Sequence, residues 1–271
     1  MRIAIVGCGW LGRPLAKQLK QSGHSIVATC RSAQKREALE QLGYSSHVYQ
    51  LGDLLSSDAL KAVFQCSLLI LNLPPGGRQI KPDFYIEHMC QLLSAARQQG
   101  VLQVIFISTT AVYGDIEGKV VEKTPLAPAT ESGRAHQKIE QHARDVFAGS
   151  ACVLRLAGLV GTDRHPAKYL AARTDISHGS QVVNLVYQQD VITAIEAIIA
   201  QDKYANIFHL CAHEHPTRHD YYRWACAKLG LELPEFAVEK HEHQGKIIDA
   251  HWTCETLGLE LSYASPYAML A

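Results

Sequence analysis

Three glycines near the start of the chain have the spacing G-x-G-x-x-G and stand between a short apolar run and an amphipathic segment. The apolar residues 3–6 predict a buried strand, and residues 14–19 predict the helix that follows it. Gly7 would allow a tight turn, Gly9 would let a pyrophosphate approach the backbone, and Gly12 would let the helix pack closely on the sheet. The free N–H groups of the first helical turn would then face the phosphates. The stretch therefore predicts a dinucleotide-binding β–α unit.

Strand-like and helix-like segments alternate over the first 160 residues, and this predicts an α/β fold of the Rossmann type, with a doubly wound parallel sheet. After the first strand, the expected strands are residues 25–30, 47–51, 67–73, 103–108, 151–156, 182–186 and 207–211. The expected helices include residues 83–99, 132–147, 190–200 and 218–229. We expect residues 1–160 plus 182–211 to form the dinucleotide-binding domain, and residues 161–181 plus 212–271 to form a small substrate-binding lobe.

The composition limits the partners that the chain can have. Lys+Arg and Asp+Glu both number 26, and this balance argues against nucleic acid or an anionic membrane as the main partner. The eight cysteines form no C-x-x-C motif and most lie in apolar segments, so we expect reduced cysteines in a cytoplasmic protein. Because a strand is predicted at residues 3–6, we expect no signal peptide, and the chain has no apolar run long enough to predict a membrane span.

Arg31 follows the second predicted strand, at the position where a site selective for NAD has an acidic residue that binds the ribose 2′-hydroxyl. Its planar guanidinium could stack on the adenine and pair with a 2′-phosphate. We therefore expect NADP to be preferred over NAD as the cofactor. The alternative is that Arg31 is a solvated residue before the next helix. Trp10 and Leu11, inside the glycine loop, are further expected cofactor contacts.

Two later loops are expected to touch the cofactor. Asp53, which follows the third strand, could accept a hydrogen bond from the adenine amino group or could cap a helix, and Leu54 lies beside it. The fourth strand is almost wholly apolar and runs through Leu73 into the Pro/Gly-rich loop at residues 74–77. At the carboxyl edge of the sheet, Leu73 and Pro74 would lie over the middle of the cofactor.

Polar residues follow the fifth and sixth strands at the same edge of the predicted sheet. Tyr113 is expected to shape the substrate pocket by packing, or to transfer a proton through its phenol. The candidates to bind anionic groups of the substrate are Arg155, Arg164, His165 and Lys168. For Arg155, a buried structural ion pair is the alternative.

Histidines gather in the second half of the chain, at His209, His213, His215 and His219 and again at His241 and His243. Such clusters can supply zinc ligands. No cysteine lies at a suitable spacing, however, and alternate residues of a strand face opposite sides of a sheet. We therefore expect no metal site.

Five motifs follow one another along the chain: GCGWLG at Gly7, GDL at Gly52, STTAVYG at Ser108, LRLAGLVG at Leu154 and NLVYQQD at Asn184. Together they resemble the extended short-chain dehydrogenase/reductases, the group of NAD-dependent sugar-nucleotide epimerases and dehydratases. GWLG, SGR and the combination of LRLAGLVG with RHP resemble an atypical subgroup usually called YeeZ-like. The resemblance covers essentially the whole chain. It implies a Rossmann domain with a small C-terminal substrate domain, a bound NAD(P), a cytoplasmic location and a homodimer.

The resemblance also reveals a departure from the family's catalytic pattern. The extended family uses a Ser/Thr after the fifth strand and a Tyr-x-x-x-Lys pair on the next helix, whose tyrosine is the general acid/base. Thr109 takes the Ser/Thr position, but Ser132 stands where the tyrosine belongs and His136 where the lysine belongs. Four residues apart, Ser132 and His136 share one helical face. His136 could act as a base together with Thr109; alternatively it hydrogen-bonds a ribose or lies on the helix surface.

Two functions from different classes remain open. The first is an NADP-dependent reductase, epimerase or dehydratase for a small polar substrate, which could carry a nucleotide. The second is a dinucleotide-binding or redox-sensing module without turnover. An open pocket lined by Thr109, Arg164 and His165 would favour the enzyme. A site whose space beside the nicotinamide is filled by side chains would favour the sensor.

Overall fold

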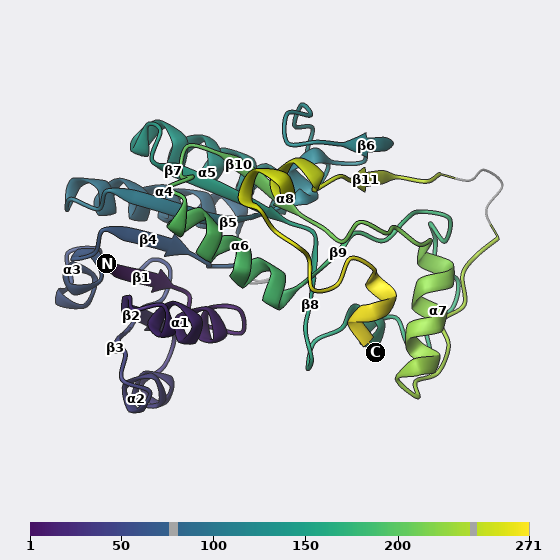
Figure 1. Ribbon diagram of the computed structural model, residues 1–271, viewed down its shortest axis with the longest axis horizontal. Coiled ribbons are helices and arrows are strands. Elements are labelled where there is room, and N and C mark those ends of the chain that lie inside the picture. Colours follow the sequence, from purple (N-terminus) through teal and green to yellow (C-terminus); the bar gives the residue numbers. More distant parts are fainter. Residues whose placement is uncertain (76–80, 239–242, 271) are drawn as a thin grey trace.

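Seven parallel strands form the central sheet in the computed structural model, which describes residues 1–75, 81–238 and 243–270 (Figure 1). The strands are β1 Arg2–Val6, β2 Ser25–Cys30, β3 Ser45–Val48, β4 Leu68–Leu71, β5 Gln103–Thr109, β7 Ala151–Leu156 and β10 Ile207–Leu210. Their order across the sheet is β10-β7-β5-β4-β1-β2-β3. The direction of winding therefore changes between β1 and β4, which is where doubly wound sheets bind ligands at their carboxyl edge. The predicted fold class is confirmed.

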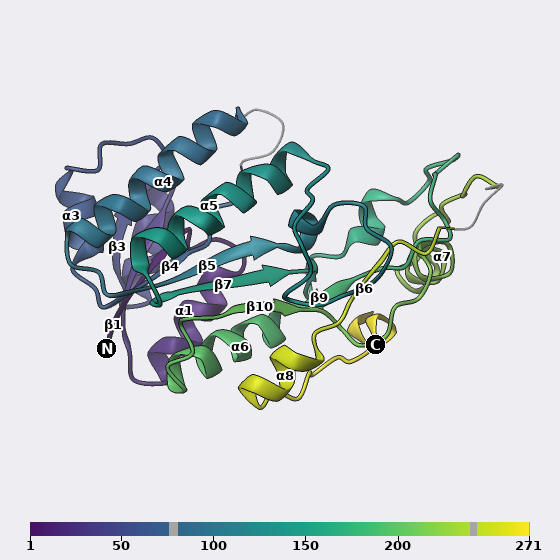
Figure 2. The ribbon, with the colours of Figure 1, turned by 90° about the horizontal axis from the view of Figure 1, so that it is seen from above.

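Helices cover both faces of this sheet (Figure 2). One face packs against α1 Gly12–Gln21, α2 Ala33–Gln41 and α6 Gln188–Ala200, and the other against α3 Asp58–Phe64, α4 Pro82–Gln98 and α5 Glu131–Phe147. Because both faces are covered, neighbouring residues of one strand are equally buried: Ile3 and Ile5 belong to one core, and Ala4 and Val6 to the other. This is why the strands could be predicted from short apolar runs.

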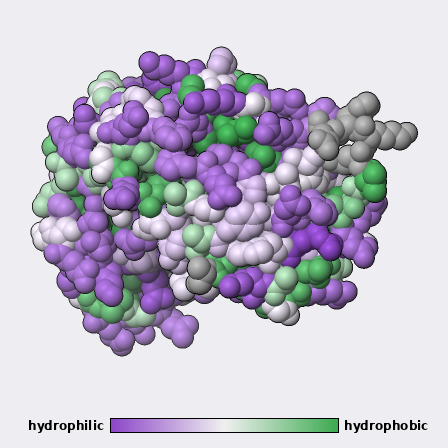
Figure 3. Space-filling model, turned by 45° about the vertical axis from the view of Figure 1, so that its right-hand side comes forward, coloured by the Kyte–Doolittle hydropathy of each residue, from purple (hydrophilic) through white to green (hydrophobic). Residues whose placement is uncertain are grey.

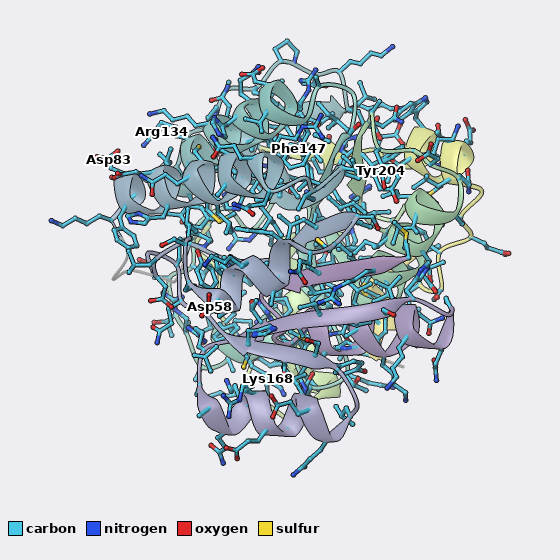
Figure 4. All side chains as sticks on the ribbon, turned by 90° about the vertical axis from the view of Figure 1, so that its left-hand side faces the viewer. Asp58, Asp83, Arg134, Phe147, Lys168 and Tyr204 are labelled. Atoms are coloured by element: carbon cyan, nitrogen blue, oxygen red, sulfur yellow. The ribbon has the colours of Figure 1, made fainter. Side chains whose placement is uncertain are left out.

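Helix α5 carries a regular stripe of apolar residues on a polar helix. Thr130 caps its first turn, because the threonine hydroxyl accepts a hydrogen bond from the N–H of Gly133 at 3.0 Å. Ile139 and Phe147 are buried against the sheet, whereas Arg134 is exposed on the outer side (Figure 4). The packing of α5 fixes which of its side chains face the sheet.

Outside the central sheet, the chain forms two short parallel strand pairs and a separate apolar core. The pairs are β8 Gly158–Val160 with β9 Leu185–Tyr187, and β6 Gly118–Val120 with β11 Lys246–Ile248. The lobe's helices are α7 Arg218–Lys228 and α8 His251–Leu257, with the 3-10 helices η3 Pro166–Tyr169 and η4 Pro266–Leu270; a further 3-10 helix, η2 Thr110–Tyr113, follows β5. Tyr221, Tyr222 and Met269 are buried in this second core. Helix α7 lies well away from the central sheet (Figure 1).

Several predicted boundaries differ from the observed ones. β3 ends at Val48 rather than at residue 51, because a turn begins at Gln50, whose N–H donates to the Asp53 carboxylate at 2.8 Å. The strand expected at residues 182–186 is β9 Leu185–Tyr187, since Val182 and Val183 instead hydrogen-bond other lobe segments. Helix α3 and strand β6 were not predicted from the sequence. The domain boundaries remain a prediction.

The eight cysteines are all free, and six of them are buried. Their place in the apolar interior agrees with the expectation of core thiols. Within the described ranges, the structure contains no helix with the length and apolar character that crossing a bilayer requires.

Candidate functional site

The glycine loop has the geometry that a dinucleotide requires. Gly7 has φ +98°, and a Cβ there would lie 2.3 Å from the carbonyl oxygen of Asn72. A Cβ on Gly12 would lie 2.7 Å from the carbonyl oxygen of Gly7, so the helix can approach the loop only without a side chain. A Cβ on Gly9 would meet nothing within 4 Å. Gly9 therefore faces open space, while the other two glycines are required by contacts inside the protein.

The start of α1 is open toward this space. The residue before the helix is the buried Leu11, which provides no side-chain cap. The loop itself is held by its neighbours: Thr29 Oγ1 accepts from the N–H of Gly7 at 3.0 Å, and Asn72 Nδ2 donates to the Gly7 carbonyl at 3.1 Å. A rigid loop thus presents an uncapped helix N-terminus, the feature that binds phosphate in many proteins.

Trp10 links the glycine loop to the segment that follows β8. Its indole Nε1 donates to Asp163 Oδ1 at 2.6 Å, and the guanidinium of Arg164 lies 5.2 Å from its ring centroid. Gly161 makes room for the ring, because a Cβ there would lie 2.5 Å from the indole. Gln188 Nε2 also donates to the Trp10 carbonyl at 2.9 Å. The loop and this segment of the lobe are therefore one contiguous surface.

The residues expected around the adenosine lie at the surface. Arg31 is exposed between β2 and α2. The Asp53 carboxylate accepts from the N–H of Gln50, and α3 is capped by Ser57, so Asp53 does not cap that helix. Leu54 is 78% exposed. An apolar side chain left in water beside the second and third strands is suited to cover an adenine ring.

The loop after β4 lies partly in the described chain. Tyr85 Oη donates to the carbonyl of Leu73 at 2.7 Å, which fixes the point where the chain leaves the sheet. Leu73 is half-buried and Pro74 is exposed. Gly76 and Gly77, which we expected to close over the cofactor, lie outside the described residues.

The three residues expected at the catalytic positions have very different surroundings. Thr109 is half-buried and its Oγ1 accepts from the N–H of Ala111 at 3.2 Å, while Ser132 is exposed. His136 is buried, and its Nδ1 donates to the carbonyl of Ser132 at 2.8 Å. Burial lowers the pKa of His136, which favours the neutral imidazole. Nε2 is then the nitrogen left to accept a proton.

Arg155 is not available to a substrate, which corrects its place among the anion-binding candidates. It is buried, and its guanidinium donates to both carboxylate oxygens of Glu140, with the shortest contact at 2.7 Å. Ser108 Oγ donates to the same carboxylate at 2.5 Å. The alternative of a buried ion pair is the one that the structure shows.

Tyr113 belongs to the same buried network. It is fully buried, and its hydroxyl accepts from Arg155 Nη1 at 2.8 Å. Burial raises the pKa of Tyr113, although the adjacent guanidinium opposes that shift. Tyr113 therefore occupies a packing position in the core.

His165 caps the lobe's first 3-10 helix. Its Nδ1 accepts from the N–H of Ala167 at 3.1 Å, so Nε2 carries the proton and donates to the hydroxyl of Tyr221 at 2.8 Å. The side chain is 3% exposed, and burial, followed by the charge of Lys168, lowers the pKa of His165 to about 4. Both ring nitrogens are used inside the protein, so the geometry gives His165 a structural task.

A pocket of 390 Å³ lies between the carboxyl edge of the sheet and the lobe. Its lining includes three cations, Arg164, Arg218 and Lys246, together with Thr110 and Asn184. Among the residues that the structure describes, aspartate and glutamate are absent from that lining. An anionic molecule is therefore the ligand that the charges favour. The face of the molecule seen in Figure 3 is mostly hydrophilic, with apolar residues gathered in small groups.

The residues that line the pocket differ in part from those predicted. Of the three residues expected to line it, Arg164 does so, whereas the neighbours Thr110 and Pro166 replace Thr109 and His165. Arg218 and Lys246 were missed, because they lie in the lobe, where no motif indicates a site. A depression of 580 Å³ is lined by residues of α1 and by Leu42 and Tyr44.

The histidines are dispersed through the lobe and the sheet. His209 is buried in β10 with its Nε2 3.0 Å from Glu122 Oε1, and His213 stacks on His251 with ring centroids 4.3 Å apart. His241 is outside the described residues. In the part of the chain that the structure describes, no group of three or more His, Cys, Asp or Glu side chains could hold a metal ion.

Comparison with known proteins gives consistent matches. The sequence model of the NAD dependent epimerase/dehydratase family matches residues 3–211. The chain is 37% identical to protein YeeZ of Escherichia coli strain K12 over 239 residues, which are 87% of this chain and 86% of that protein.

Two solved structures share the fold over nearly their full lengths. A functionally unknown conserved protein from Silicibacter pomeroyi DSS has a TM-score of 0.78 and 25% identity, covering 99% of this chain and 96% of its own. The UDP-glucuronic acid 4-epimerase of Bacillus cereus, in complex with UDP-glucuronic acid and NAD, has a TM-score of 0.79 and 19% identity, covering 100% of this chain and 96% of its own. This second likeness concerns the fold alone.

Proposed function

The chain belongs to the NAD dependent epimerase/dehydratase family, and we propose that it is an NAD(P)-dependent enzyme acting on a small anionic substrate, with a nucleotide-linked sugar as the leading class. The observation that carries this proposal is the pocket of 390 Å³, whose described lining has three cations and no carboxylate, beside an open glycine loop. A binding module without a substrate has no use for such a pocket.

The residues of the loop fit a dinucleotide. Gly9 leaves the space for the pyrophosphate, the uncapped start of α1 supplies N–H groups, and Leu54 offers an apolar surface to the adenine. When bound, the nicotinamide supplies hydride transfer. Arg31 is exposed at the position that contacts the ribose 2′-substituent, which supports the preference for NADP.

The anionic groups of the substrate would be held by Arg164 and Arg218. Arg218 Nη1 donates to the carbonyls of Ser177 and His178 at 3.0 and 3.2 Å, which orients the guanidinium at the pocket. A fixed guanidinium can bind a phosphate through two parallel hydrogen bonds. The UDP-glucuronic acid bound by the B. cereus protein is an example of a ligand with this chemistry.

A dinucleotide-binding module without turnover is the second candidate. The exposed Ser132 and the buried His136 favour it, because neither reproduces the tyrosine and lysine that the resemblance leads one to expect at their positions. Both functions require the dinucleotide, but only the enzyme also binds a substrate in the pocket.

Thermal unfolding with added ligands tests the proposal. A ligand present at about a hundred times its Kd stabilises the fold by about 2.7 kcal/mol. We expect stabilisation by NADPH that exceeds that by NADH, and further stabilisation when UDP-glucuronic acid or UDP-glucose is added. Arg31→Ala should remove the difference between the two dinucleotides, whereas Lys35→Ala should retain it. Stabilisation by NADPH without any effect of the UDP-sugars favours the module, and no effect of either dinucleotide contradicts both functions.

A further inference from the structure

The side chain of Lys246 extends from β11 to the segment that follows β5. Lys246 is half-buried in β11, and its Nζ donates to the carbonyl oxygen of Gly114 at 2.7 Å. It lines the same pocket as Thr110 and Arg164. A cationic nitrogen from the C-terminal part of the chain therefore lies at the carboxyl edge of the sheet.

The backbone around this lysine is held on both sides. Asn184 Nδ2 donates to the carbonyl of Lys246 at 2.9 Å, and Asn184 Oδ1 accepts from the N–H of Ile248 at 2.9 Å. On the other side, β11 pairs with β6, with Lys246 opposite Gly118. The side-chain amide of Asn184 thus makes the hydrogen bonds that a neighbouring strand would make. The backbone of Lys246 is therefore held in a fixed position.

The surroundings of the Lys246 amine lower its affinity for a proton. Burial lowers the pKa of Lys246, and the charge of Asp115 opposes this shift only in part. The guanidinium groups of Arg164 and Arg218 line the same pocket. An amine of this kind can exchange its proton closer to neutral pH than a solvated lysine can.

We propose that Lys246 is the proton-transferring residue of this pocket, whose lining includes neither Ser132 nor His136. This inference rests on the proposed function. In the reductive direction, the ammonium group gives a proton to the substrate carbonyl oxygen, while the carbonyl carbon gains a hydride from the reduced dinucleotide. In the reverse direction, the neutral amine accepts the hydroxyl proton as the hydride leaves that carbon.

Pyridoxal 5′-phosphate is a suitable probe, because it carries an aldehyde for the amine and a phosphate for the arginines. The neutral amine attacks the aldehyde and loses water to form an imine, which borohydride reduces to a stable secondary amine. Peptide mass spectrometry then identifies each modified lysine. We expect Lys246 to be modified several times faster than the exposed Lys228 at pH 8, because burial lowers the pKa of Lys246 and the arginines beside it attract the phosphate of the probe.

Three comparisons sharpen this test. Pyridoxal without its phosphate should lose most of the preference for Lys246, and so should pyridoxal 5′-phosphate on the Arg164→Gln variant. Across pH, the modification of Lys246 should reach half its maximal rate at a lower pH than that of Lys228. Lys246→Arg retains the charge and can still donate to Gly114, but a guanidinium does not give up its proton. This variant should bind NADPH and the UDP-sugars as the wild type does while losing turnover of any UDP-sugar that the wild type converts.

Two results would overturn the inference. One is equal modification of Lys246 and Lys228 with the same pH dependence, and the other is full turnover by Lys246→Arg. The labelling rates are measured on the wild-type protein, so they decide the matter even where a variant does not fold. Both results leave the proposed function intact as long as NADPH and the UDP-sugars stabilise the protein. Loss of that stabilisation would count against the proposed function instead.

Discussion

The guanidinium of Arg164 stacks on the indole of Trp10, with 5.2 Å between the guanidinium carbon and the ring centroid. One residue belongs to the glycine loop and the other lines the cationic pocket. A cation on an aromatic face contributes about 0.5–1 kcal/mol at an exposed site. The two halves of the proposed site are therefore in direct contact, and a change in either can be detected in the other.

Trp10 should report dinucleotide binding through its fluorescence. We expect NADP⁺ to change the tryptophan emission of the wild-type protein, because Trp10 follows Gly9 in the loop. Trp10→Phe should lose most of this change, whereas Trp224→Phe, in the lobe core, should keep it. An equal response in the two variants would place the dinucleotide elsewhere.

Gly9 and Gly12 should respond differently to the same added methyl group. Gly9→Ala should leave the free energy of unfolding unchanged within about 0.5 kcal/mol, since nothing lies within 4 Å of the new Cβ. It should weaken dinucleotide binding by about tenfold or more, or about 1.4 kcal/mol, because the methyl group occupies the space for the pyrophosphate. Gly12→Ala should lower stability by about 1–3 kcal/mol through its contact with the Gly7 carbonyl. Urea denaturation and dinucleotide titration measure both quantities. Unchanged NADPH binding by a folded Gly9→Ala protein would contradict the site.

Glu140→Gln should be strongly destabilising. The change leaves the buried guanidinium of Arg155 without its counter-charge, which costs about 3–5 kcal/mol. Glu40→Gln is the matched control, because Glu40 forms an exposed ion pair with Arg36 and such pairs contribute less than about 1 kcal/mol. Urea denaturation gives both values. Similar small effects of the two variants would reopen Arg155 as a ligand-binding residue.

Acid should destabilise the protein partly through His165. The folded protein holds the pKa of His165 at about 4, below the ordinary value of 6.5, so the unfolded chain binds more protons between these values. Stability is then complete above pH 6.5 and is lost as the pH falls toward 4, by up to about 3 kcal/mol.

His165→Asn isolates this contribution. The asparagine oxygen can still accept from the N–H of Ala167, but it does not titrate. Urea denaturation at several pH values should show a shallower loss of stability between pH 6.5 and 4 than in the wild type. His136, His213 and His215, whose pKa values burial also lowers, keep their share of the slope in both proteins. Identical slopes would show that His165 binds a proton equally well in the folded and unfolded states, which would contradict the lowered pKa.

The sheet and the glycine loop could be predicted because their signals are local. Residues 3–6 are apolar because helices cover both faces of the sheet. Gly7 and Gly12 are required by backbone contacts with Asn72 and within the loop, whereas Gly9 faces open space. Arg155 shows where such reasoning ends. Its partner Glu140 lies on a different element, and only the packing of α5 on β7 decides whether the guanidinium meets a carboxylate or a ligand.

The sequence of the lobe gives fewer signals of its site residues than the sequence of the sheet does. Lys246 stands in a strand of three residues, and Arg218 begins a helix that the sequence predicts. Nothing in the sequence marked either of them as a pocket residue. His165 was expected to bind the substrate, but both of its ring nitrogens contact the protein, through Ala167 and Tyr221 from separate elements of the lobe. Residues that meet only through tertiary packing are the ones that sequence reasoning did not find.

The hydrogen bonds from Asn184 to β11 have a consequence for how the protein is made. During synthesis, the glycine loop and all seven strands of the central sheet leave the ribosome before Lys246 does. A nascent chain can therefore complete its dinucleotide loop while the neighbouring pocket still lacks one wall. A chain interrupted before β11 would therefore contain the glycine loop but lack Lys246 from the pocket lining.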